Sequence, residues 1–331
     1  MKRAILYGAG DLRIEDSFPE PKDLEPDEIY VTTEVTAFST GTDLANYCGK
    51  STEVPGAPDY PRPVGYSNAG VVQRAGSEVH QLSEGQRVFS LKPHQSAYIA
   101  RGDELVVPIP RGVSPEQASL AYLTQLGLTA LRQARYEPGE TMAVVGLGVI
   151  GLCTVSLARA MGARVLAFTN CESREELARQ LGAEAAFTDE PSVKVVHDRI
   201  DVVILTANTW SAYRTAVEIA RPGGRVAILG FPGRGQPNPD FNPFHPQWFY
   251  RKSLALIAAG IAPAVECDPA EVRFNLRRNL ECVLDWMASG VLRLERLISH
   301  RFPAAEMVQA YELARQHDKS LTCAIFDWRS P

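Results

Sequence analysis

Three glycines at residues 146, 148 and 151 have the spacing Gly-x-Gly-x-x-Gly, which is typical of sites that bind dinucleotide phosphates. They follow the apolar segment 141–145, whose pattern predicts a strand, and they open segment 149–161, whose pattern predicts a helix. In this setting Gly146 permits a tight turn, Gly148 lets the backbone approach a pyrophosphate, and Gly151 packs the helix onto the strand. The motif therefore predicts a dinucleotide-binding turn.

Further cofactor contacts are expected around this turn. The unpaired N–H groups at the start of a helix hold anionic phosphates, and we count Val149 and Ile150 among the contacts. Gly230, which ends a later predicted strand, is expected at the cofactor as well.

The end of the next strand bears on which dinucleotide binds. An NAD site normally carries Asp or Glu about 20 residues beyond the motif, where it holds the ribose hydroxyls. Here Thr169 and Asn170 stand at that place, with Arg174 shortly after them. Hydroxyl, amide and guanidinium groups bind a 2′-phosphate that a carboxylate would repel. NADP(H) is therefore favoured over NAD(H), although Glu172 could hold the ribose hydroxyls instead.

The elements that must position this site alternate along the chain between strand and helix. Strands are predicted at 141–145, 164–169, 201–206 and 225–230, and helices at 149–161, 174–181 and 212–220. Alternation at this spacing predicts a doubly wound parallel sheet with helices on both faces.

The chain on either side of this region has a different pattern. Residues 1 to about 110 are β-rich, with Gly and Pro between short strands at 29–35, 70–74, 87–91 and 96–100. Ser114, Pro115 and Gln117 predict a capped helix start, and a second helical segment is expected around 127–134. A final strand at 321–328 has no place in the parallel sheet, so we expect it to return to the N-terminal region.

Composition excludes several classes of function. A chain of 331 residues with 45% hydrophobic and 22% charged residues is an ordinary globular protein large enough for two domains. A net charge of −5 argues against nucleic acid as a partner. No stretch approaches the roughly 20 apolar residues of a membrane-spanning helix, and the N-terminus has no signal-peptide pattern, so we expect a cytoplasmic protein. Six scattered cysteines without a Cys-x-x-Cys pair indicate reduced thiols.

Several segments together resemble the medium-chain dehydrogenase/reductase family over nearly the whole chain. Residues 40–43 resemble its Cys-Gly-Thr-Asp segment, residues 65–72 its Gly-His-Glu-x-x-Gly-x-Val segment, and residues 125–130 its Cys-x-Gly-x-Thr-Ala segment. The resemblance implies a GroES-like β-barrel catalytic domain from residues 1–124 and 275–331, and a Rossmann domain from residues 125–274. It also implies a homodimer and a small-molecule substrate.

Zinc-dependent members hold their catalytic metal at three positions that here read Thr40, Tyr66 and Gln125. None of these is a good zinc ligand, and the cysteine-rich structural zinc lobe is missing between Arg87 and Pro110. We therefore expect no zinc. Residues 39–43 and 325–328 most resemble a zinc-free branch that includes the bacteriochlorophyll-pathway hydroxyethyl dehydrogenase, and other zinc-free members are quinone reductases.

Without a metal, a side chain or solvent must stabilise the alkoxide that hydride transfer creates on a carbonyl. Tyr66 is the first candidate for the acid, or it packs in the vacated metal position. By resemblance Thr42 matches a proton relay and Thr129 lies beside the nicotinamide. Asp43 either fixes its loop or takes part in catalysis. His94 either relays protons or is a solvated loop histidine.

Candidates for substrate contact are Thr40 and the rings of Trp248 and Phe249, from the aromatic segment 244–250. These rings line the pocket or belong to the core. The segment precedes 253–257, a strand that often forms the dimer edge in this family.

The function predicted first is zinc-independent interconversion of a secondary alcohol and a ketone on a biosynthetic small molecule, with NAD(P)H. An enoyl or quinone reductase acting on an activated C=C bond is the second hypothesis. A catalytically silent NADPH-binding protein is the third.

Overall fold

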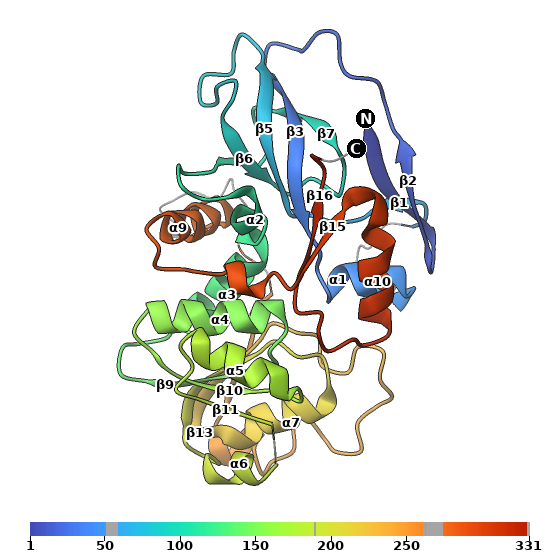
Figure 1. The fold of residues 1–331 in the computed structure, drawn as a ribbon. Coiled ribbons are helices and arrows are strands. Elements are labelled where there is room, and N and C mark those ends of the chain that lie inside the picture. The colour runs from blue at the N-terminus through green and yellow to red at the C-terminus, as the bar shows by residue number, and fades with distance from the viewer. Residues whose placement is uncertain (51–58, 189, 261, 263–273, 330–331) are drawn as a thin grey trace. The chain divides into compact units, whose positions relative to one another are not determined.

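The computed structural model describes residues 1–331 except 51–58, 189, 261, 263–273 and 330–331 (Figure 1). The chain forms two compact units. One consists of Met1–Tyr122 with Leu280–Pro331, and the other of Leu123–Asn279. The proline-dense segment 55–63, whose composition predicts a surface loop, lies partly outside the described residues, and Cys267 lies wholly outside them.

The unit Leu123–Asn279 is built on a parallel sheet with the strand order β11-β10-β9-β12-β13-β14 among the described residues. The strands are β9 (Thr141–Val145), β10 (Arg164–Phe168), β11 (Ala185–Phe187), β12 (Ile200–Leu205), β13 (Ala220–Ile228) and β14 (Ala255–Ala258). The helices are α3 (Ala121–Gln133), α4 (Val149–Ala160), α5 (Glu172–Gln180), α6 (Glu190–Val195), α7 (Trp210–Ile219) and α8 (Phe249–Lys252).

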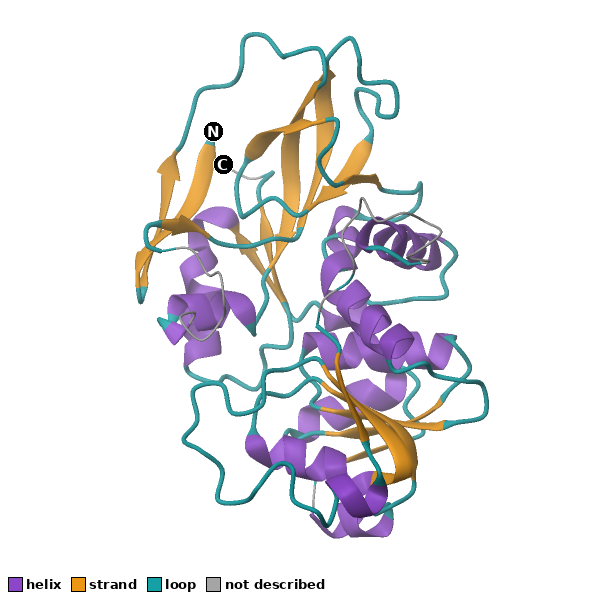
Figure 2. Ribbon diagram, turned by 180° about the vertical axis from the view of Figure 1, so that it is seen from behind, coloured by secondary structure: helices purple, strands orange, loops and turns teal. Residues whose placement is uncertain are grey.

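Both faces of this sheet are buried. Ala143 and Val203 lie in one apolar cluster with Tyr213 and Val217 of α7. Because side chains alternate along a strand, the fully buried Met142 of β9 points to the opposite face. Burial on both faces is the expected environment of a parallel sheet, and the predicted doubly wound α/β arrangement is confirmed (Figure 2).

The other unit contains two sheets in which most neighbouring strands are antiparallel. The larger has the order β15-β16-β3-β5-β6-β8, with β7 also paired to β3, and the smaller the order β2-β1-β4. The strands are β1 (Lys2–Gly8), β2 (Asp11–Asp16), β3 (Glu28–Ala37), β4 (Arg62–Pro63), β5 (Asn68–Ala75), β6 (Arg87–Ser90), β7 (Ala97–Arg101), β8 (Val106–Pro108), β15 (His300–Pro303) and β16 (Ala324–Asp327). The C-terminal strand β16 pairs antiparallel with β3, with Phe326 opposite Thr36.

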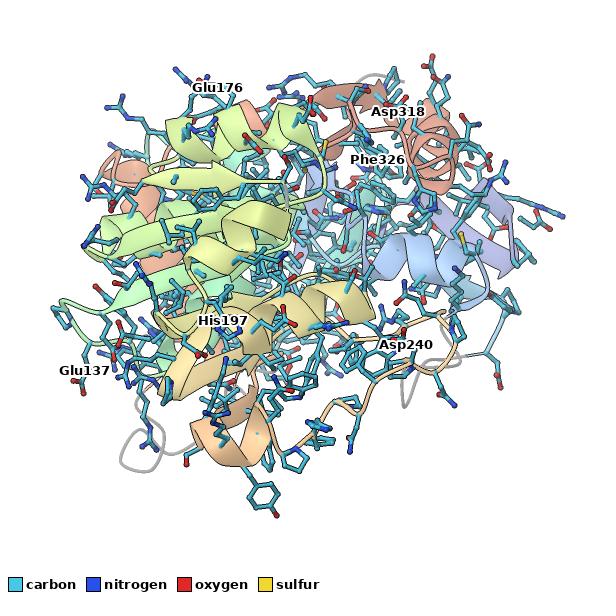
Figure 3. The ribbon with its side chains drawn as sticks, turned by 90° about the horizontal axis from the view of Figure 1, so that it is seen from below. Glu137, Glu176, His197, Asp240, Asp318 and Phe326 are labelled. Carbon is cyan, nitrogen blue, oxygen red and sulfur yellow. The ribbon has the colours of Figure 1, made fainter. Side chains whose placement is uncertain are left out.

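The helices of this unit are α1 (Thr42–Tyr47), α2 (Pro115–Ala118), α9 (Leu276–Ala288), which begins in the other unit, and α10 (Met307–Arg315). Its core includes Phe38, Tyr311 of α10 and Phe326, which is labelled in Figure 3. The rings of Phe38 and Tyr311 lie 4.6 Å apart, and those of Tyr311 and Phe326 are nearly parallel. No described helix has the length and apolarity needed to cross a membrane.

The structure differs from the predicted elements at two places. Helix α3 begins at Ala121 rather than near residue 127, because its early polar residues Thr124 and Gln125 are buried and hide the apolar pattern. The hairpin of β1 and β2 was not predicted. Gly8 and Gly10, which interrupt the apolar N-terminal run, form its turn, with Gly10 at a φ of 76°. The capped start of α2 is as predicted, with reciprocal bonds between Ser114 and Gln117.

Candidate active site

The glycine motif forms a tight turn between β9 and α4. Gly146 has a φ of 99°, in the left-handed region that favours glycine. A Cβ atom on Gly151 would lie 1.9 Å from the carbonyl oxygen of Gly146, so only glycine lets the helix start this close to the strand end. The backbone turn at Gly146 and the close packing at Gly151 therefore both require glycine, as the motif predicts.

Gly148 differs from its two neighbours in the motif. It is the N-cap of α4, has an extended backbone with φ −70° and ψ −177°, and supplies no side chain to cap the helix. A Cβ atom at Gly148 would meet no atom of the described chain within 4 Å. The fold therefore does not itself require glycine here, whereas a pyrophosphate that approaches the N–H groups of Val149 and Ile150 does. These residues fit a bound dinucleotide.

A threonine that the motif did not reveal stabilises this turn. Thr206 follows β12, and its hydroxyl donates to the carbonyl oxygen of Gly146 at 2.7 Å. Ala207 comes next, and Cβ atoms on Gly146 and Gly230 would lie 2.7 and 2.5 Å from Ala207 atoms. Gly146, Thr206 and Gly230 thus meet where β9, β12 and β13 end. A polar residue directly after a parallel strand is the signal that could have found Thr206.

The residues that bear on dinucleotide preference lie where β10 leads into α5. The Thr169 hydroxyl accepts a hydrogen bond from the N–H of Cys171 at 3.2 Å, and Asn170 is exposed. Glu172 is exposed in the first turn of α5, and Arg174, two residues later in the same helix, is half-buried. The structure therefore brings the two alternatives, the guanidinium and the carboxylate, to the same helix start.

In the other unit, Asp43 holds two loops together. Its buried carboxylate accepts hydrogen bonds from the N–H of Ser39 at 2.9 Å and from the N–H of Gly65 at 3.2 Å. Both carboxylate oxygens are used by the backbone, which makes Asp43 a positioning residue in this structure. Residues 39–42 and Tyr66 are placed by this pair of bonds.

Tyr66 lies among the groups that Asp43 positions. Its hydroxyl interacts with the hydroxyls of Ser39 and Thr42, and its ring meets Tyr122 edge-on at 5.1 Å. Burial, followed by the Asp43 carboxylate, raises the pKa of Tyr66 well above its usual value, and the two hydroxyls oppose this shift. The phenol therefore stays protonated over the physiological range.

The remaining predicted neighbours of Tyr66 differ in exposure. Thr42 begins α1 and is exposed, whereas Thr40, two residues before it, is half-buried. The Tyr66 hydroxyl thus interacts with the side chain of an exposed residue.

His94 is fully buried, so the hypothesis of a solvated loop histidine is wrong. Its Nδ1 lies 2.8 Å from the Thr36 hydroxyl, which accepts a hydrogen bond from the Trp328 indole at 3.0 Å. The Thr36 hydroxyl thus contacts both the His94 imidazole and the Trp328 indole. Nε2 lies 3.7 Å from the Asp43 carboxylate, beyond hydrogen-bond distance.

Thr129 and the aromatic candidates lie in the unit Leu123–Asn279. Thr129 is buried in α3, and its hydroxyl donates to the side chain of Gln125 at 3.0 Å. Trp248 is also buried, in the cluster that contains Phe241, and its indole donates to the Pro243 carbonyl at 3.1 Å. Phe249 packs partly buried against the same cluster. The core alternative thus describes the surroundings of both rings.

The predicted residues therefore form two groups. Thr40, Thr42, Asp43, Tyr66 and His94 belong to one unit. The cofactor candidates, with Thr129, Trp248 and Phe249, belong to the other: Gly146, Gly148, Val149, Ile150, Gly151, Thr169, Asn170, Arg174 and Gly230.

Comparison with known proteins adds the following. Residues 149–262 match the family model described as "Zinc-binding dehydrogenase". A sorbitol dehydrogenase of Bombyx mori is 26% identical, with 94% of each chain covered. A sorbitol dehydrogenase of Bacillus subtilis (strain 168) is 27% identical over 71% of this chain and 76% of its own. The crystal structure of galactitol-1-phosphate dehydrogenase from Escherichia coli has a TM-score of 0.82 at 20% identity, with 99% of this chain and 100% of that chain covered.

Over residues 149–262 the chain is thus similar to zinc-binding dehydrogenases, over most of its length it is similar to a sorbitol dehydrogenase, and its fold is similar to that of galactitol-1-phosphate dehydrogenase. The predicted fold class, a Rossmann sheet with a GroES-like β-barrel domain, is confirmed by this likeness in fold. The narrower resemblance to a zinc-free branch has no support in the comparisons.

The cofactor prediction, NADP(H) without zinc, is contradicted. The matching family is one of zinc-binding dehydrogenases, so zinc is among the groups that the family implies. The side chains of Thr40, Tyr66 and Gln125 do not fit a zinc ion. Within the described residues no group of three or more His, Cys, Asp or Glu is placed to hold a metal ion.

Proposed function

We propose that the protein is an NAD(P)-dependent dehydrogenase that interconverts a secondary alcohol and a ketone on a small biosynthetic molecule. The observation that carries the proposal is the open space around Gly148. Gly148 leaves the N-terminus of α4 open to a ligand and has no structural need to be glycine. Relatives that are sorbitol dehydrogenases support an alcohol or polyol as the substrate.

The bound dinucleotide supplies or accepts the hydride. Reduction of a ketone also requires a proton for the new alkoxide, and we assign this proton to the Tyr66 hydroxyl. Its raised pKa keeps it protonated, while Ser39 and Thr42 orient it. Asp43 fixes the backbone of both loops and touches no reacting atom in this assignment. Thr42, which is exposed, passes the proton between Tyr66 and water.

The experiment that tests this function is a titration with NADH and NADPH, followed by assays with three sets of substrates. These are secondary alcohols including polyols, the matching ketones, and enones or quinones. The proposal predicts dinucleotide binding and turnover of the alcohol–ketone pairs. Turnover of enones or quinones alone would replace it with the reductase hypothesis, and binding without any turnover would replace it with the silent binding protein.

We further propose that two copies of the chain associate through β14. This strand is the edge of the parallel sheet, and its end residues Ala255 and Ala258 are exposed. An edge strand presents unpaired N–H and C=O groups that a second copy can pair with. Sedimentation analysis should give the mass of two chains, and a single-chain mass at micromolar concentration would contradict the proposal.

A further inference from the structure

A buried chain of polar side chains in the unit Leu123–Asn279 runs from Arg132 through Asn279 and Thr129 to Gln125. The Arg132 guanidinium donates to the amide oxygen of Asn279. The amide nitrogen of Asn279 donates to the Thr129 hydroxyl at 3.0 Å, and that hydroxyl donates to the Gln125 amide oxygen at 3.0 Å. Asn279, Thr129 and Gln125 are each at most 2% exposed.

The chemistry of Arg132 fixes the direction of every bond in this chain. A guanidinium has donors only, so Asn279 must face it with its amide oxygen. The amide nitrogen of Asn279 then faces Thr129, which leaves the Thr129 proton for Gln125. Because the oxygen of Gln125 is occupied, Gln125 is left with only its N–H groups to offer. Among the residues that the structure describes, the amide nitrogen of Gln125 donates no hydrogen bond.

Gln125 lies on a helix close to the glycine turn. This helix, α3, packs against α4, which begins at that turn. The Thr124 hydroxyl lies 3.4 Å from Cys153, and a Cβ atom on Gly127 would lie 2.5 Å from the Thr154 hydroxyl. These contacts place α3, the helix that carries Gln125, beside the helix that the glycine turn opens.

We propose that Gln125 binds a ligand, and that its oriented amide N–H donates to an oxygen acceptor in that ligand. The acceptor is either the carboxamide oxygen of the nicotinamide ring or the carbonyl oxygen of the substrate. This inference rests on the proposed dehydrogenase function. In this assignment Asn279 and Thr129 are positioning residues, because they act on the ligand only through Gln125.

The test uses Gln125→Glu, which keeps the acceptor for Thr129 and replaces the amide donor. Gln125→Met removes the donor with a side chain of similar size that suits a buried site. Gln81→Glu makes the first change at an exposed loop position and serves as the control. For each full-length variant we would measure the dissociation constants of NADH and NADPH without substrate, the kcat/KM for a ketone, and the thermal midpoint.

Both Gln125 variants should lose about tenfold or more in either dinucleotide affinity or kcat/KM, but not in both. A hydrogen bond worth 1.4 kcal/mol corresponds to a factor of ten. A loss in dinucleotide affinity identifies the carboxamide as the acceptor. A loss in kcat/KM with unchanged dinucleotide affinity identifies the substrate oxygen. If Gln125→Glu and Gln125→Met both match Gln81→Glu, the inference is overturned while the proposed function stands. A wild-type protein that binds neither dinucleotide overturns both.

Asn279→Asp tests the orienting chain without touching Gln125. The carboxylate still accepts from Arg132, but it also accepts the Thr129 proton, so Gln125 loses its orienting donor. The quantity that falls in Gln125→Glu, either dinucleotide affinity or kcat/KM, should fall severalfold in Asn279→Asp as well. The thermal midpoint of this variant should be no lower than that of the wild type. A merely structural network would move the thermal midpoint and leave ligand binding unchanged, which would contradict the positioning role.

Discussion

At the residue scale, the proposed chemistry depends on the Tyr66 hydroxyl and on the groups around it. The Asp43 carboxylate joins two loops through backbone N–H groups, and the hydroxyls of Ser39 and Thr42 then face the phenol. Tyr122 contacts the Tyr66 ring edge-on but supplies no hydrogen bond to it. The hydroxyl and the ring of Tyr66 can therefore be tested separately.

Tyr66→Phe should reduce the kcat for ketone reduction by about 100-fold, at the low end of the contribution of a general acid. Dinucleotide affinity should not change, because the variant keeps the ring and its contact with Tyr122. Steady-state kinetics and a fluorescence titration measure the two quantities. Tyr122→Phe is the matched control and should retain nearly full activity, and equal losses in both variants would argue against Tyr66 as the proton donor.

The raised pKa of Tyr66 gives a second prediction. A raised pKa keeps the acid form present to higher pH, so Tyr66 can donate a proton throughout the neutral range. The kcat for ketone reduction should therefore fall only above the ordinary tyrosine pKa of about 10. A pH–rate profile with a descending limb below pH 9 that persists in Tyr66→Phe would show that another group supplies the proton.

The site could be predicted from the sequence only in part, and His94 shows why. Its neighbours Pro93 and Gln95 predict a loop, and the loop is present, but its backbone bonds to Ala4 and Val64 and the imidazole packs edge-on against Phe326. Those partners are distant in sequence, so local pattern cannot reveal the burial. In the sequence Gln125 likewise stands out only as a poor metal ligand, because its oriented amide depends on Asn279, more than a hundred residues away.

At the element scale, the strand–helix alternation was enough to predict the parallel sheet, since each helix must cross over to the next strand. The end of α7, predicted at residue 220, agrees with the observed end at Ile219, but the group that binds its last carbonyls was not predicted. These carbonyl groups are bound by the buried Lys252 of α8, whose ammonium donates to Val217 at 2.7 Å, Glu218 at 2.8 Å and Ala220 at 3.0 Å.

Lys252→Met should lower the free energy of unfolding by about 2 kcal/mol, because it leaves buried carbonyl groups without their charged donor. The ion pair with Asp198 is lost as well. Denaturant unfolding monitored by circular dichroism measures the change. Arg251→Met, at the exposed neighbouring position of the same helix, is the control and should change stability by less than about 0.5 kcal/mol. Equal stability of the two variants would contradict the capping role of Lys252.

At the scale of the whole molecule, the chain leaves one unit and returns to it. Strand β3, from the N-terminal part of the chain, pairs with the C-terminal strand β16. The segment Leu123–Asn279 lies between these two strands in sequence and forms a unit of its own. The return of the last strand was predictable because it had no place in the parallel sheet. The pairing register was not, since it depends on which apolar residues of β3 are already covered.

Binding of the dinucleotide by the glycine turn is the central claim, and Gly148→Ala tests it most directly. Its added Cβ meets no atom of the described chain, whereas it would occupy the space where a pyrophosphate must approach. The variant should keep the thermal midpoint of Gly8→Ala, a control glycine with an equally open Cβ position, and lose at least about tenfold in affinity for NADH and NADPH, a factor that corresponds to 1.4 kcal/mol. Unchanged affinity in a folded Gly148→Ala protein would contradict the claim.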